Sequence, residues 1–174
     1  GFSLKYPSDF IKEEKLEKDQ VFPNAIDIIG FYINENSEEI LLMLMEDDTI
    51  FQGLSDQKFL DKMKNEFKSR ICSAIPDPTL LTCSMEVLAE NSGSNPNVHY
   101  LYAASYRFTV SDKQNPEQST NAVIITATYP DGNDVWMLVL PLTPTLTADE
   151  VDILSEVYIT MNESFKIYDY KGIQ

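Results

Sequence analysis

The sequence NAVIITATYPDGNDVWMLVLPL, residues 121–142, decides the fold of this chain. Residues 121–129 and 134–142 are two runs rich in β-branched, aromatic and other apolar residues, and such runs are typical of β-strands. The turn between them contains Asp131 and Gly132, a strong tight-turn pair because glycine adopts positive φ without steric cost. The segment therefore predicts an antiparallel hairpin.

Two more strands are predicted before this hairpin, over residues 82–91 and 98–110, with polar turns between successive strands. Successive hairpins imply a four-stranded antiparallel meander. The last strand is apolar on both faces, because every residue from Val135 to Leu140 is apolar. A strand of this kind indicates that both sides of the sheet are covered.

Two amphipathic segments are predicted to form the covering helices. In residues 55–72 the apolar residues recur at three- and four-residue steps, and Ser55 is the expected N-cap. Residues 147–166 show the same periodicity. There Thr147 and Glu150 have the spacing of a capping box, in which each side chain accepts a hydrogen bond from an otherwise unpaired backbone N–H group.

The first part of the chain is predicted to complete the sheet. Residues 2–6 alternate between apolar and polar, which indicates a strand with one buried face, and Pro7 ends it. Residues 12–20 are charged, so they indicate a solvated excursion or a ragged edge strand. Residues 26–33 and 40–45 are short apolar runs on either side of a polar turn, and they predict a hairpin.

The composition limits the number of domains and the kinds of partner. The 174 residues fit a single domain, residues 1–174, because a chain of about 150 residues can bury most of its unfolded surface in one core. The net charge of −15 repels phosphate groups, so no nucleic-acid partner is expected. The longest apolar runs, residues 40–45 and 136–142, are far shorter than the roughly 20 residues that a transmembrane helix needs.

Residues suited to catalysis or metal binding are sparse. His99 is the only histidine, and it lies in a predicted strand, where a structural or merely exposed side chain is the favoured interpretation. Asp47 with Asp48, or Asp131 with Asp134, could be imagined to bind a hard cation, but the spacing of an EF-hand is absent and aspartates at turns normally bind backbone N–H groups. The six glycines form no phosphate-binding motif. The sequence thus predicts no enzyme, no metal site and no cofactor.

One aromatic stripe could form a binding surface. Tyr100, Tyr102, Tyr106 and Phe108 lie on the same side of one predicted strand if that strand is regular. Tyrosine combines a large apolar area with a polar tip, so the stripe could be a platform for a peptide or a sugar. The alternative, which we favour, is that a helix packs over these side chains.

The two cysteines could form a disulfide bond or remain free thiols. Cys72 lies at the end of a predicted helix and Cys83 at the beginning of a predicted strand, and this layout allows the Cα separation that a disulfide requires. Both positions suit core packing as free thiols, which is the interpretation that the sequence favours. A disulfide would instead agree with export to an oxidising compartment.

The two ends of the chain resemble the PsbP/Mog1-like fold. The residues that carry the resemblance are Phe2-Ser-Leu-Lys-Tyr-Pro-Ser-Asp-Phe10 and Glu163-Ser-Phe-Lys-Ile167, and the element order agrees over nearly the whole chain. The resemblance implies an α+β fold in which an antiparallel β-sheet is sandwiched between helices. Members of this group differ in function, and the resemblance implies a non-catalytic, protein-binding scaffold more often than an enzyme.

We therefore expect a binding or scaffold module, the soluble domain of a bacterial extracytoplasmic lipoprotein, with another protein as its partner. Gly1 resembles a scar of tag cleavage, so we expect that a signal peptide or a lipid-anchoring cysteine stood upstream. The main alternative is an intracellular protein-binding adaptor of the Mog1 kind. A hydrolase that uses His99 is the third alternative.

Overall fold

The structure is a computed structural model, and it describes residues 2–15, 25–32, 40–46, 56–92, 102–116, 120–129 and 134–167. The two helices are α1 (Asp56–Ser73) and α2 (Ala148–Ser164). The strands are β1 (Phe2–Ser3), β2 (Ile11–Lys15), β3 (Ala25–Tyr32), β4 (Ile40–Glu46), β5 (Leu81–Ser92), β6 (Tyr102–Asp112), β7 (Thr120–Tyr129), β8 (Asp134–Leu142) and β9 (Lys166–Ile167).

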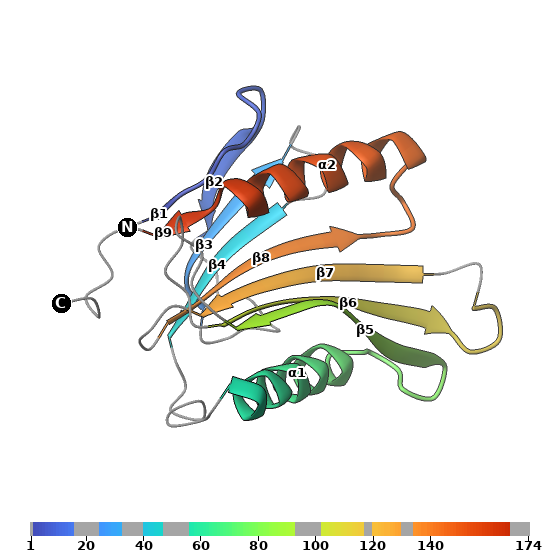
Figure 1. Cartoon of the computed structure of the whole chain (residues 1–174). Helices are drawn as coiled ribbons and strands as arrows, with labels where there is room; N and C mark the ends of the chain where they lie inside the picture. The colour runs from blue at the N-terminus through green and yellow to red at the C-terminus, as the bar shows by residue number, and fades with distance from the viewer. Residues whose placement is uncertain are drawn as a thin grey trace.

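Seven of these strands form one antiparallel sheet in the order β2-β3-β4-β8-β7-β6-β5. The predicted meander is confirmed as β5 to β8, and the predicted hairpin of β3 and β4 joins it where β4 pairs with β8. The two helices lie on opposite faces of the twisted sheet (Figure 1). The α+β fold class, with an antiparallel sheet between helices, is therefore confirmed.

The sheet divides the apolar interior into two cores. Along β8, Val135, Met137 and Val139 belong to the core under α1, whereas the residues between them belong to the core under α2. This alternation is the two-residue period of a strand with both faces buried. It confirms the prediction that β8 is covered on both sides.

Helix α2 begins as the sequence predicts. The side chain of Thr147 accepts a hydrogen bond from the backbone N–H group of Glu150, at 3.3 Å. The carboxylate of Glu150 accepts one from the backbone N–H group of Thr147, at 2.8 Å. This reciprocal pair is the capping box, and it holds the pKa of the Glu150 carboxyl below its ordinary value through hydrogen bonds from the Thr147 backbone and side chain. The expected N-cap of α1, Ser55, lies outside the described residues.

The N-terminal strand is shorter than predicted. Only Phe2 and Ser3 are in a strand, and they pair with β9, not with the large sheet. After Ser3 the backbone leaves the ladder, and the N–H group of Lys5 donates to the side-chain oxygen of Ser164 at 2.7 Å. The two ends of the chain that carry the family resemblance thus lie side by side (Figure 1). Of the charged stretch 12–20, the described part belongs to edge strand β2.

Candidate binding surface

Two of the four residues of the predicted aromatic platform are not on the surface. Tyr106 and Phe108 are fully buried beneath α1, and the ring centroids of Phe67 and Tyr106 are 6.1 Å apart. The platform interpretation is therefore wrong for these two residues, and the favoured alternative, a helix packed over them, is the one observed. Tyr100 and the side chain of Tyr102 lie outside the described residues.

The hydroxyl group of Tyr106 reaches the border of this core. It donates a hydrogen bond to the carboxylate of Glu90 on β5 at 3.5 Å. Burial raises the pKa of Tyr106, and the charge of Glu90 raises it further because a nearby anion opposes ionisation of the phenol. This tyrosine therefore remains protonated and acts as a fixed donor that joins β6 to β5.

The other residues considered for catalysis or metal binding cannot be placed in a site. His99, Asp47, Asp48 and Asp131 lie outside the described residues, as does the side chain of Asp134. Within the described ranges, no group of three or more histidine, cysteine, aspartate or glutamate side chains lies together in the manner of a metal site. In the same ranges, no helix is long and apolar enough to span a membrane.

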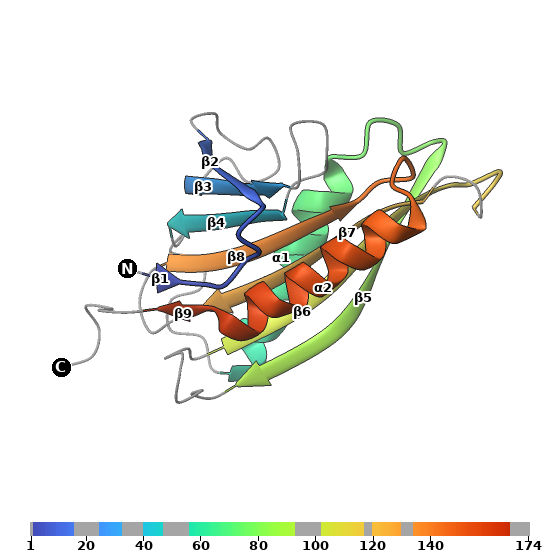
Figure 2. The same ribbon diagram turned by 90° about the horizontal axis from the view of Figure 1, so that it is seen from above.

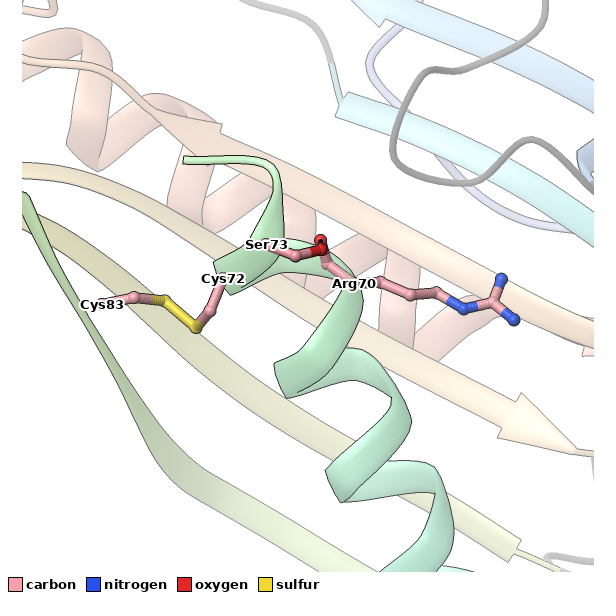
Figure 3. The surroundings of a disulfide bond; sticks show 4 residues. All are labelled: Arg70, Cys72, Ser73 and Cys83. Atoms are coloured by element: carbon pink, nitrogen blue, oxygen red, sulfur yellow. Dashed lines mark hydrogen bonds between the residues drawn. A yellow bond between two sulfur atoms is a disulfide. The ribbon is translucent and has the colours of Figure 1, made fainter. Parts of the chain in front are cut away.

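Cys72 and Cys83 are joined by a disulfide bond, so the preference for free thiols was wrong. Their Cα atoms are 5.6 Å apart, because the short loop after α1 returns the chain into β5 (Figure 1). Figure 3 shows the bond between the end of the helix and the strand. The side chain of Arg70, in the same last turn of α1, extends away from the bond (Figure 3). The bond therefore attaches α1 to the outermost strand of the meander.

Strand β5 is one border of the described sheet, and β2 is the other (Figure 2). The two borders differ in length and composition. β2 has five residues, of which four are charged, whereas β5 has twelve and contains neither lysine nor arginine. Short edge strands rich in charged residues, lysine especially, resist pairing with other chains, and a longer edge strand without lysine lacks that protection.

Two apolar side chains are exposed where β5 is irregular. The pairing with β6 shifts register between Val87 and Ala89, which places one extra residue, Leu88, in β5. The exposed fractions of Val87 and Leu88 are 39% and 41%. Sequence reasoning missed this surface, although one signal was present: two large apolar residues in succession interrupt the alternation of Met85, Glu86 and Val87.

The face of β5 and β6 turned away from α1 is polar. Helix α2 makes its main strand contact with β8, and β5 and β6 extend beyond it in Figure 2. Glu86 and Arg107 lie opposite each other there and form an ion pair of 3.5 Å. The side chain of Glu86 is 62% exposed, so its carboxylate is accessible from solvent. An exposed ion pair of this kind contributes about 0.2–1 kcal/mol to stability. Glu86 can therefore leave Arg107 and pair with another cation at small cost.

A small cavity lies on this same side of the sheet, under the end of α2. Its volume is about 10 Å³, and its lining includes Leu4, Thr128, Trp136 and Phe165. This volume holds about one water molecule, whereas pockets that bind small molecules have volumes of roughly 300–1,000 Å³. The border strand β5 is therefore the better candidate for a functional surface.

Comparison with known proteins does not identify a family. No protein-family model matches the chain, and no curated protein matches it. A crystal structure of LpqN, described as involved in cell envelope biogenesis of Mycobacterium tuberculosis, is similar in structure, with a TM-score of 0.48 and 14% sequence identity. The similarity covers 95% of this chain and 82% of LpqN. A likeness at this level does not assign the chain to the PsbP/Mog1-like group or to any other.

Proposed function

We propose that this chain is a non-catalytic, protein-binding module of a bacterial cell envelope, the folded domain of an extracytoplasmic lipoprotein. The observation that carries the proposal is the disulfide bond between Cys72 and Cys83. Disulfides persist in oxidising compartments, whereas glutathione and thioredoxin keep cytosolic thiols reduced. The bond thus favours export over the intracellular adaptor.

The two tyrosines with shifted pKa values have structural roles in the fold. The buried tyrosines Tyr106 and Tyr158 have raised pKa values, and burial is the main cause for both. Each hydroxyl group makes hydrogen bonds between elements of the fold, to Glu90 for Tyr106 and to Leu138 for Tyr158. Strongly shifted groups are candidates for catalysis when they face a cleft. Here they join packed elements, which is a structural role.

The cellular location of the protein is tested by expressing the complete gene, from its native start codon, in its own host. Cells are converted to spheroplasts, and the protein is tested for digestion by added protease while a cytosolic control protein stays intact. We expect digestion of this protein before lysis. Protection until lysis would contradict export and would favour the intracellular adaptor.

The absence of catalysis is tested with the purified chain. A broad hydrolase screen is expected to show no turnover above that of the His99→Ala variant. His99 is chosen because it is the single histidine of the chain and the side chain best suited to proton transfer near neutral pH. Turnover that disappears in His99→Ala would show that the chain is an enzyme.

A further inference from the structure

We infer that β5, at the border of the described part of the sheet, binds an extended, basic segment of a partner protein, which adds a strand to the sheet. This inference rests on the proposed binding function and gives it a surface and a partner chemistry. A border strand offers backbone N–H and C=O groups to an incoming chain, and exposed side chains beside them select its sequence.

The first support is that β5 is held in place before any partner arrives. The disulfide attaches Cys83 to α1, and Met85 packs against the core under that helix. Further along the strand, Glu90 accepts the hydrogen bond from Tyr106. A strand that is already ordered loses little conformational entropy on binding, so more of the interaction energy appears as affinity.

The second support is the contrast between the two borders. On β2, Lys12, Glu13 and Glu14 are exposed and discourage pairing with a further strand. On β5, the exposed large apolar residues are Val87 and Leu88, next to one another at the register shift. The stretch before the shift, residues 81–87, is long enough for a typical strand of about five or six residues to pair with it.

The charge of the surface selects a basic occupant. The only charged residues of β5 are Glu86 and Glu90, and the chain as a whole has a net charge of −15. An extended segment with alternating lysine and apolar residues would bring cations toward Glu86 and apolar side chains toward Val87 and Leu88. A second copy of this chain fits less well, because the pairing would bring two surfaces of equal negative charge together.

The test uses the oxidised full chain and a synthetic peptide of about nine residues, a common strand length. The peptide alternates lysine and valine and is blocked at both ends. A control peptide carries proline at every valine position, which keeps the charge but removes N–H groups and prevents strand pairing. Affinity is measured by fluorescence anisotropy at physiological salt, and hydrogen exchange locates the bound peptide.

We expect the lysine–valine peptide to bind at least about tenfold more tightly than the proline peptide, and to slow amide exchange in residues 81–87. The matched variants are Leu88→Lys on β5 and Ile11→Lys on β2, because each replaces an apolar residue that is 41% exposed and each adds one positive charge. Leu88→Lys should weaken binding by about tenfold, and Ile11→Lys by much less.

Several outcomes would overturn the inference. Equal affinity for the two peptides, or equal loss in the two variants, would mean that charge alone attracts the peptide. No measurable binding, or protection outside residues 81–87, would exclude this border as the site. A dimer in sedimentation that Leu88→Lys dissociates would assign the border to a second copy. None of these results would affect the spheroplast test, so the proposed location could stand while the binding surface fails.

Discussion

The hydroxyl group of Tyr158 on α2 lies 2.7 Å from the side-chain oxygen of Thr126 on β7 and donates a hydrogen bond to the carbonyl oxygen of Leu138 at 3.1 Å. Thr126 lies in turn 2.8 Å from the side-chain oxygen of Ser105 on β6. A buried polar chain therefore joins the helix to three neighbouring strands. Networks of this kind fix one packing arrangement when every member is satisfied.

Removal of the Tyr158 hydroxyl group should destabilise the fold. Tyr158→Phe leaves the buried Leu138 carbonyl without this donor, so we expect the free energy of unfolding to fall by about 1–3 kcal/mol. Urea denaturation followed by circular dichroism measures the change. Tyr6→Phe is the control, because Tyr6 is exposed, and it should change the stability much less. Equal effects of the two substitutions would argue against the polar chain.

The stability should also decrease at alkaline pH. Burial raises the pKa of Tyr158 above that of an unfolded tyrosine, about 10. The stability from this group is therefore fully present below about pH 10 and is lost as the pH rises through the folded-state pKa. Denaturation midpoints between pH 8 and 11.5 should fall more steeply in the unmodified chain than in Tyr158→Phe. Parallel curves would contradict this source of the pH dependence.

At acid pH the capping box should weaken. The pKa of Glu150 lies below its ordinary value because of hydrogen bonds from Thr147, so its stabilising effect is present above the unfolded pKa and is lost as the pH falls through the folded one. We expect Glu150→Gln to reduce the acid dependence of the melting temperature. Thr147→Ala should cost about 1 kcal/mol at neutral pH through loss of the N-cap. An unchanged acid profile in Glu150→Gln would remove the capping box as its cause.

Phe165 should anchor the end of α2. Its ring is buried and lies 5.8 Å from that of Trp136, measured between centroids. Truncation in Phe165→Ala should reduce the free energy of unfolding by about 3–5 kcal/mol, because it removes a large buried side chain. Ile159→Ala on the exposed side of α2 is the control and should have a small effect. A melting temperature of Phe165→Ala equal to that of the unmodified chain would show that the packing is different.

The core of the fold could be predicted from periodicity, because burial on one face or on two produces different patterns. The continuous apolar run of β8 and the capping residues Thr147 and Glu150 indicated a two-sided sheet and the start of α2. Residues 2–6 were less informative, because alternation does not reveal which strand is the partner. Their pairing with β9 depends on contacts between the two ends of the chain.

The surface could not be predicted to the same extent. Alternation placed Tyr106 and Phe108 on one side of β6, but it could not say that α1 lies over that side. The disulfide depended on how closely the loop after α1 returns Cys83 to Cys72, and sequence separation does not determine that distance. The exposed residues Val87 and Leu88 depended on a register shift in β5 that a regular strand pattern does not include.

Export to an oxidising compartment is tested most directly by the oxidation state of Cys72 and Cys83 in protein recovered from its own host. Cells are quenched with acid and alkylated without reduction, and the protein is cleaved before aspartate residues. Trypsin is unsuitable, because no lysine or arginine lies between the two cysteines, whereas Asp77 does. We expect an unlabelled pair of peptides joined through the cysteines, and the two peptides should separate after reduction. Two alkylated cysteines on separate peptides would contradict the disulfide and, with it, the assignment of this chain to an oxidising compartment.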